Sequence, residues 1–166
     1  MDAGLLLARL VFGLLMAGHG AQKVFGWFGG YGLAGTGGFF ESLGFKPGRW
    51  FAAAAGGTEL VAGLLLAAGL LGPLGPALIL AVMIVAMATV HWAHGLFADK
   101  NGIEVPLLYA TAATAIALSG HGAYSADALL GLSWSAPVIW SALAAGAIGG
   151  LANLAIRKTD RVAVHV

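Results

Sequence analysis

The residues best suited to chemistry are a few ionisable side chains that interrupt or border long apolar segments of the sequence. In chain order they are Arg9, His19, Lys23, Glu59, His91, His94 and Glu104. An ionisable side chain at the centre of a membrane span costs about 2.5–3.5 kcal/mol on insertion scales, so its position is informative. Such side chains are expected to face one another or a functional site rather than lipid.

The spacing of these residues places several of them on shared helix faces. Arg9 and Lys23 fall on one stripe at helical spacing, with His19 at its flank. Glu59 lies among alanine and glycine in the next apolar segment, which indicates close contact with another helix. If the two segments are antiparallel neighbours, Glu59 comes roughly level with Met16, within a turn of His19. We therefore expect a polar cluster in one half of a helical bundle, formed by His19, Lys23, Glu59, His91 and Glu104.

Four interpretations of this cluster stay open. Glu59 could pair with His19 or a basic residue, and so neutralise charge. The cluster could instead bind a small molecule, and a quinone fits because its carbonyl needs hydrogen-bond donors and a proton source. A proton or solute pathway is the third interpretation. Metal binding is the fourth, but His91 and His94 without a spaced carboxylate or cysteine are a weak signal, and we predict no metal site.

The composition assigns the apolar segments to a membrane. Of the 166 residues, 60% are hydrophobic and 9% are charged, against about 45–50% and about 25% in soluble domains. A soluble domain of this size could not hide so much apolar surface, whereas a bilayer removes that need. The sequence has no cysteine, which excludes thiolate catalysis and Cys-ligated metals on this chain. The sequence has no basic run that would suit a nucleic acid, and its net charge of +1 does not indicate such a partner.

The apolar pattern predicts an all-α transmembrane bundle of five spans. The segments cover residues 4–25, 49–71, 74–95, 105–119 and 137–156. All five prolines fall at segment edges, where proline can begin a helix without breaking it. The connection at residues 71–76 is so short that the second and third spans must be antiparallel neighbours.

Basic residues predict the orientation in the membrane. With the N-terminus outside and the C-terminus in the cytoplasm, seven of the eight Lys and Arg residues face the cytoplasm, and only Arg9 lies towards the outer end. This is the distribution of the positive-inside rule, and it favours an odd number of spans. The chain ends in a basic tail that contains Arg157, Lys158 and Arg161.

Three regions outside the polar cluster carry further signals. Residues 26–48 combine glycine with aromatic rings, which is typical of a membrane–water interface, and residues 39–45 fit a short amphipathic helix there. A re-entrant loop is the alternative. Gly146 and Gly150 belong to a small-residue face, interpreted as packing inside the bundle or as the contact of a homo-oligomer. His121 and Asp127 fall in an outer loop, where we expect them to be solvated.

No independent catalytic motif is present. The run 35–38 is not a dinucleotide fingerprint, because no βαβ pattern surrounds it. Ser119, Ser125, Ser133 and Ser135 lie in no nucleophile elbow. Whether the chain is an enzyme therefore stays undecided, and an enzymatic role would be that of an oxidoreductase subunit acting with quinone.

Parts of the sequence resemble the DoxX family of integral membrane proteins. The resemblance lies in residues 9–13, 19–23, 26–30, 35–36, 39–40 and 102–104, in Glu59, and in Gly120, Gly122, Tyr124, Ser125 and Asp127. It covers about residues 5–130 and implies four spans. Residues 1–130 would then be a DoxX-like four-helix membrane domain with the interfacial loop 26–48, and residues 131–166 an additional C-terminal span and basic tail.

The resemblance implies a protein of the bacterial plasma membrane with a redox association. Relatives are membrane subunits in thiosulfate-to-quinone oxidation, or membrane partners of superoxide dismutase and a sulfurtransferase. We therefore expect a membrane subunit or anchor of a redox system, without a covalent cofactor, that binds quinone through Arg9, His19, Lys23, Glu59 and His91. The alternatives are a membrane scaffold for soluble redox proteins and a transporter of protons or small solutes.

Overall fold

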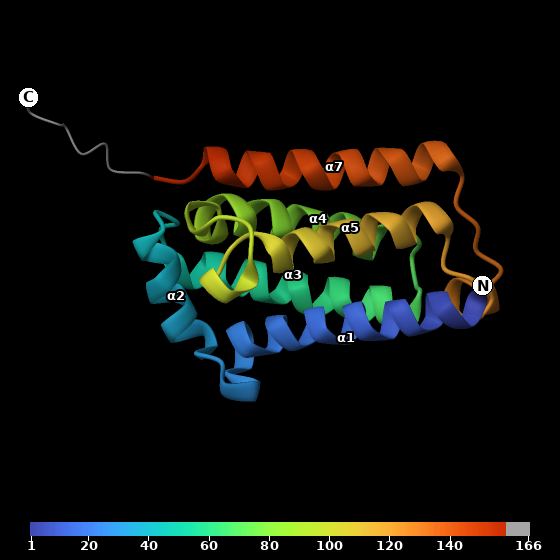
Figure 1. The fold of residues 1–166 in the computed structure, drawn as a ribbon, viewed down its shortest axis with the longest axis horizontal. Coiled ribbons are helices and arrows are strands. Elements are labelled where there is room, and N and C mark those ends of the chain that lie inside the picture. The colour runs from blue at the N-terminus through green and yellow to red at the C-terminus, as the bar shows by residue number, and fades with distance from the viewer. Residues whose placement is uncertain (159–166) are drawn as a thin grey trace, which may run out of the picture.

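The structure, a computed structural model, describes residues 1–158, and within them the chain forms helices and no strands. Five helices run along the long axis of the molecule (Figure 1), namely α1 (Asp2–Phe25), α3 (Gly48–Ala68), α4 (Leu74–Ala86), α5 (Glu104–Ser119) and α7 (Ala136–Ala155). The short helices α2 (Gly32–Ser42) and α6 (Ala126–Leu129) lie at opposite ends of this bundle. The predicted all-α bundle is confirmed. The long helices begin and end within a few residues of the predicted limits, provided that the turns following α4 are counted with it.

Glycine and proline set the limits of these helices. Pro47 and Pro73 directly precede α3 and α4, and Pro137 lies in the first turn of α7, so none of them interrupts a helix interior. α1 and α3 end at Gly26 and Gly69, whose φ angles are 74° and 63°. This left-handed conformation suits glycine because it has no Cβ.

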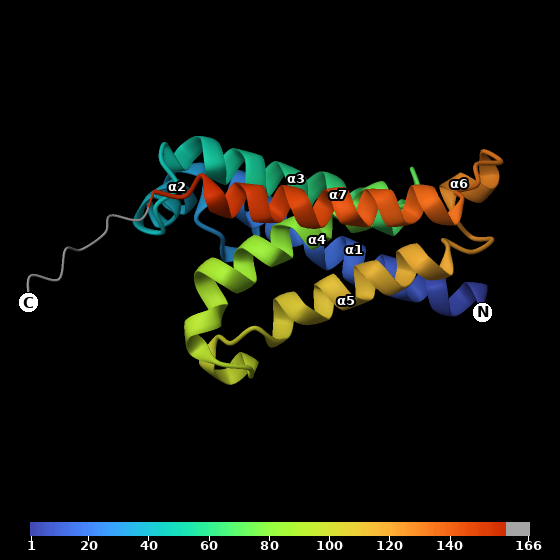
Figure 2. The same ribbon diagram turned by 90° about the horizontal axis from the view of Figure 1, so that it is seen from above.

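The third span continues beyond the α-helical part of α4. A π-helical turn, η2 (Met87–His91), and a 3-10 turn, η3 (Trp92–His94), extend it, so that the apolar span covers Leu74–His94. Figure 2 shows this end of the span diverging from α3 and α7. The loop that returns to α5 contains a further 3-10 turn, η4 (Ala98–Lys100).

Small residues allow α1 and α3 to pack closely. A Cβ added at Gly13 would lie 2.6 Å from the backbone nitrogen of Ala67, and one added at Gly20 or Gly63 would also overlap backbone atoms of the facing helix. Glycine at these positions therefore lets the two backbones touch. The core beside this contact is apolar and includes Met16, which is fully buried.

Apolar side chains also cover the outside of the bundle. Leu7 is 64% exposed, Ile148 66% and Leu151 59%. A surface of this kind suits lipid tails and not water. Within residues 1–158, four helices are long and apolar enough to cross a membrane: α1, α3, α4 with its extension, and α7. The protein is therefore a multi-pass membrane protein.

The fourth predicted span, α5, is shorter than the four spans formed by α1, α3, α4 with its extension, and α7. α5 has 16 residues, which is about 24 Å at 1.5 Å per residue. The hydrocarbon core of a bilayer is about 30 Å thick. α5 lies beside α4 in the bundle, and its loop with η4 extends it towards the end of the molecule.

The helix predicted over residues 39–45 begins earlier than expected. α2 starts at Gly32 and includes the glycine-rich run that was expected to be a loop. Packing on α3 outweighs the low helix propensity of glycine. Gly37 is buried against the backbone of Gly48 and Arg49, where a side chain would overlap or crowd its neighbours. α2 lies at the end of the bundle and not between its helices.

The C-terminal helix α7 packs mainly on α4. A Cβ added at Gly146 or Gly150 would overlap backbone atoms of Ala77 or Ala81 on α4. The small-residue face of α7 is thus filled inside the same chain, as one of the two interpretations expected. Of the basic tail, Arg161 lies outside the described residues.

Candidate functional site

An ion pair joins α1 and α3 inside the bundle. Lys23 Nζ donates to Glu59 Oε2 over 2.5 Å. The side chain of Glu59 is 4% exposed and that of Lys23 26%. The two residues meet because Gly20 and Gly56 let the helices approach, one turn from Lys23 and Glu59 respectively. Of the partners considered for Glu59, Lys23 forms the ion pair and His19 does not.

Lys23 and Glu59 line a cavity of about 380 Å³. This volume lies within the range of small-molecule sites, about 300–1,000 Å³. The rest of the wall is mainly apolar and comes from α2, α3, α4 with η2, and α7. Four aromatic rings contribute to it: Phe39, Phe40, Phe45 and Phe51. Its other polar side chains are Thr58, Thr89, His91 and Asn153. A few polar groups in an apolar wall are the usual composition of a ligand site.

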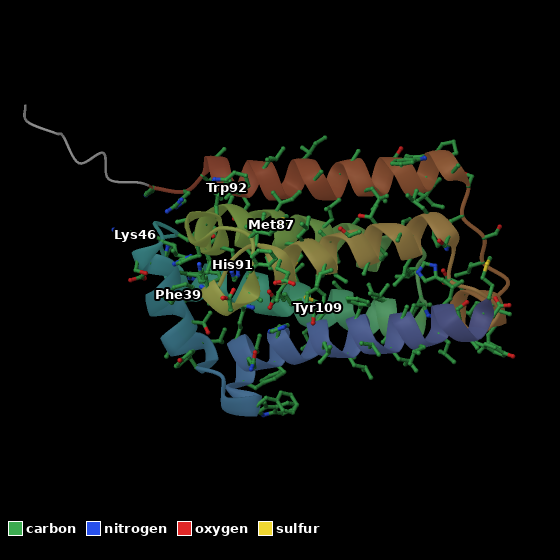
Figure 3. All side chains as sticks on the ribbon, viewed as in Figure 1. Phe39, Lys46, Met87, His91, Trp92 and Tyr109 are labelled. Atoms are coloured by element: carbon green, nitrogen blue, oxygen red, sulfur yellow. The ribbon has the colours of Figure 1, made fainter. Side chains whose placement is uncertain are left out.

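The π-helical turn η2 supplies one wall of the cavity. Thr89, Val90 and His91 from this turn line it. His91 Nδ1 is 2.8 Å from the main-chain oxygen of Asn101, which fixes the ring against the loop before α5. Figure 3 shows His91 at the same end of the bundle as Phe39 and Lys46. π-helical turns are frequent at functional sites.

The C-terminal helix completes the cavity. Gly149, Gly150 and Asn153 of α7 line it. The end of α7 is held to the loop between α2 and α3, because Arg157 Nε donates to the main-chain oxygen of Leu43 and the backbone N–H of Lys158 to that of Gly44. Residues that the sequence analysis assigned to an added span therefore form part of the same site.

His19 lies outside this cavity. Its side chain is exposed on α1, and its ring meets the edge of Tyr109 on α5, with 5.9 Å between ring centroids. Glu104, the other expected neighbour, accepts a hydrogen bond from the backbone N–H of Ala98 over 2.7 Å in the loop before α5. The predicted cluster is thus reduced to three residues that line one cavity: Lys23, Glu59 and His91.

Arg9 belongs to a different part of the molecule and does not line this cavity, although it was expected to lie with Lys23 and Glu59. The side chain is 1% exposed and donates to the main-chain oxygens of His121 and Tyr124, in the loop after α5. Arg9 Nε has no hydrogen-bond partner among the described residues. Arg9 lies two helical turns or more from Lys23 along α1, so the guanidinium anchors the opposite end of the bundle.

The expectation that His121 and Asp127 are solvated is wrong. Asp127 is 3% exposed, and its carboxylate accepts hydrogen bonds from the backbone N–H groups of Leu71 and Gly72 and from Trp134 Nε1, all within 2.8 Å. Burial lowers the pKa of His121, against the opposite effect of Asp127. These contacts join the α3–α4 turn to the segments around α6, and a smaller cavity of about 210 Å³ lies among them.

Sequence reasoning missed the aromatic and C-terminal parts of the site. Phe39 and Phe40 were noted as part of an interfacial helix, but nothing in their spacing indicates that they turn towards Glu59. Asn153 was available as a signal, because it is a polar residue within an apolar span. The π-helical turn has no comparable signal in the sequence.

The cavity combines charge, hydrogen-bond donors and acceptors with a large apolar wall. This arrangement can hold a flat amphipathic molecule whose polar atoms meet Lys23, Glu59 or His91. Within residues 1–158, no group of three or more His, Asp or Glu side chains is placed to hold a metal ion. The polar side chains of the cavity can form hydrogen bonds and exchange protons with a bound molecule.

A comparison with protein-family models matches residues 4–92 to DoxX. Searches of curated proteins and of solved structures give no match. The matched residues include α1, α3 and α4 with η2, and therefore Lys23, Glu59 and His91, whereas α7 lies beyond them. Since the family model covers more than half of the 166 residues, the chain belongs to the DoxX family.

Proposed function

We propose that this DoxX-family protein is a membrane subunit of a redox system and that it binds a quinone head group in the cavity beside Glu59. The observation that supports this most is the Lys23–Glu59 ion pair in the wall of an otherwise apolar cavity of about 380 Å³. A quinone needs both features, because its ring is apolar and its carbonyl oxygens accept hydrogen bonds.

The unused hydrogen-bonding capacity of the ion pair supports the same role. A lysine ammonium has three N–H donors, and Lys23 uses one on Glu59. Its remaining donors can meet a carbonyl oxygen of the ligand. Glu59 can exchange a proton with a bound head group, which is the task of a general acid or base. The aromatic rings Phe39 and Phe51 offer faces against which a quinone ring can stack.

Glu59→Gln tests this proposal. We expect the variant to insert and fold, and to bind a tail-less ubiquinone head group about tenfold more weakly, measured by calorimetry on protein in lipid nanodiscs. Glu104→Gln is the matched control, because Glu104 does not line the cavity and a glutamine can still accept the hydrogen bond from Ala98. Equal quinone affinity in the two variants would show that Glu59 does not contribute to quinone binding.

The distribution of charge supports an orientation with the N-terminus outside. Lys23, Lys46, Lys100 and Arg157 come from helix ends and loops at one end of the bundle, opposite to Asp2. The positive-inside rule places that end in the cytoplasm, and a bacterial plasma membrane is the membrane we propose. Because the chain has no cysteine, Ala3→Cys and Lys46→Cys can be labelled singly in intact cells. An impermeant maleimide is expected to label only Ala3→Cys, and the reverse result would invert the orientation.

A second candidate function is a membrane scaffold for soluble redox proteins. Exposed aromatic side chains favour it: Trp27 is 60% exposed, Phe28 76% and Tyr31 84%. Lys46 and Arg49, in the segment that follows α2, are exposed as well. Replacing Phe28 and Tyr31 by serine leaves the cavity untouched. Loss of a co-purifying soluble redox protein in this double variant, with quinone affinity unchanged, would favour the scaffold. Unchanged co-purification would argue against it.

A further inference from the structure

We propose that the cavity prefers the reduced, hydroxyl-bearing form of its ligand, a quinol, and that His91 Nε2 accepts a hydrogen bond from one of the two hydroxyl groups. This inference rests on the proposed function, because it specifies the ligand of the same cavity. It starts from the hydrogen bonding of His91.

The tautomer of His91 follows from its contact with the main chain. Nδ1 is 2.8 Å from the oxygen of Asn101, and a carbonyl oxygen only accepts hydrogen bonds. Nδ1 therefore carries a hydrogen. In a neutral imidazole the other nitrogen then has none, so Nε2 is an acceptor. Asn101 is not part of the cavity wall, whereas His91 is. With Nδ1 engaged by Asn101, Nε2 is the ring nitrogen that remains to meet a ligand in the cavity.

An acceptor in this position distinguishes the two redox forms of a quinone. Both oxygens of the oxidised form are acceptors, so that neither can bond to Nε2. Each oxygen of the reduced form carries a hydrogen that it can donate. One hydrogen bond corresponds to about a tenfold difference in affinity.

The other polar wall of the cavity does not discriminate in this way. Lys23 retains N–H donors, and Glu59 accepts through its carboxylate oxygens. These two residues can meet either a carbonyl oxygen or a hydroxyl group. Between the ion pair and His91, the preference between redox forms therefore falls on His91, which comes from a different element of the fold.

His94 provides a matched control on the same stretch of chain. Its Nδ1 is 2.9 Å from the main-chain oxygen of Val90, so it has the same tautomer as His91. His94 is exposed and does not line the cavity. A change at His94 alters the polarity of the region as a change at His91 does, without altering the cavity lining.

Two substitutions at His91 separate its two nitrogens. In His91→Asn the amide N–H takes the place of Nδ1 and keeps the contact with Asn101, while the acceptor is lost. In His91→Gln the amide oxygen comes near the position of Nε2 and can still accept. The preference for quinol should disappear in the first variant and persist, at least in part, in the second.

The experiment measures binding of a tail-less ubiquinone head group in its oxidised and reduced forms. The full chain is kept in nanodiscs without oxygen, at a pH well above the ordinary histidine pKa of about 6.5. We expect the wild type and His94→Asn to bind the reduced form about tenfold more tightly than the oxidised form. For His91→Asn we expect equal affinities, through weaker binding of the reduced form only.

The outcomes separate this inference from the proposed function. If both forms bind with equal affinity to the wild type, and Glu59→Gln weakens both, the cavity is a quinone site and the role of His91 is refuted. A preference for quinol that survives in His91→Asn refutes it as well. If neither form binds in a Glu59-dependent way, the proposed function fails, and this inference fails with it.

Discussion

Removing the two partners of the Lys23–Glu59 ion pair one at a time should have unequal effects on stability. Lys23→Met leaves a carboxylate that is 4% exposed without its partner. Breaking a buried ion pair in this way costs about 3–5 kcal/mol. Glu59→Gln leaves a lysine that is 26% exposed and lies two residues from the end of α1, where a long side chain can reach the interface. We expect this variant to lose about 1.5–3 kcal/mol, the contribution of a hydrogen bond to a charged group.

The double variant Lys23→Met/Glu59→Gln should recover most of the lost stability. It leaves no unpaired charge in the bundle, and neutral replacements of buried ion pairs are often as stable as the original pair. The assay is reversible unfolding of the protein in mixed micelles, by titration with sodium dodecyl sulfate. The free energies of unfolding of the wild type, both single variants and the double variant form a double-mutant cycle.

Two results would refute this reasoning. If Lys23→Met were no more destabilising than Glu59→Gln, the carboxylate would have another partner or access to water. If the two losses added up in the double variant, the residues would not be coupled. The double variant has a second use, because it is expected to be folded but to lack both charges. Weak quinone binding by this variant could not be attributed to unfolding.

Three further perturbations test other parts of the fold. Gly63→Ala should lower the free energy of unfolding by about 1–3 kcal/mol, because its Cβ would overlap the backbone of α1. Gly57→Ala on the same helix is the control: its Cβ meets open space, so in the same unfolding assay it should be neutral or slightly stabilising. Asp127→Asn should lower the free energy of unfolding by about 1.5–3 kcal/mol, since one amide oxygen cannot replace a carboxylate that accepts three hydrogen bonds. Asp99→Asn is the control, because Asp99 is exposed and its replacement should not change stability. Because the pKa of His121 is lowered in the folded state, the unfolded chain binds more protons than the folded chain just below pH 6.5. Stability should therefore fall as pH decreases through this region. Replacing His121 by Gln should flatten that part of the pH profile, and an unchanged profile would show that another group is responsible.

The sequence predicts the helices well because the physics that determines them is local. Long apolar runs and the positions of proline specify where each span begins and ends. Gly13, Gly20 and Glu59 fall on helix faces that can be read from spacing alone, which is why the contact between α1 and α3 was foreseeable. The Lys23–Glu59 pairing needs only the additional step of setting two antiparallel helices side by side.

The parts that the sequence does not predict depend on contacts between distant segments. His19 and Lys23 are one turn apart on α1, so spacing alone cannot decide which of them meets Glu59. The direction of His91 depends on the π-helical turn and on the main-chain oxygen of Asn101, and neither is visible in hydropathy. Asp127 was expected to be solvated because short polar loops usually are, but it accepts hydrogen bonds from Leu71 and Gly72 of a distant turn and from the nearby Trp134.

The two polar clusters of the bundle differ in how fully their hydrogen bonds are satisfied. At the N-terminal end, the guanidinium of Arg9 donates to two carbonyl groups and the carboxylate of Asp127 accepts three bonds within the chain. Two atoms of this cluster, Arg9 Nε and His121 Nε2, are buried without a partner among the described residues. At the other end, Glu59 has one bond and His91 one, and both line the larger cavity. Buried polar groups normally have their hydrogen bonds satisfied. Groups beside a cavity that can form further hydrogen bonds have room to form them with a ligand or water. This contrast indicates that the first cluster holds the fold together, and it supports our proposal that a ligand binds at the second.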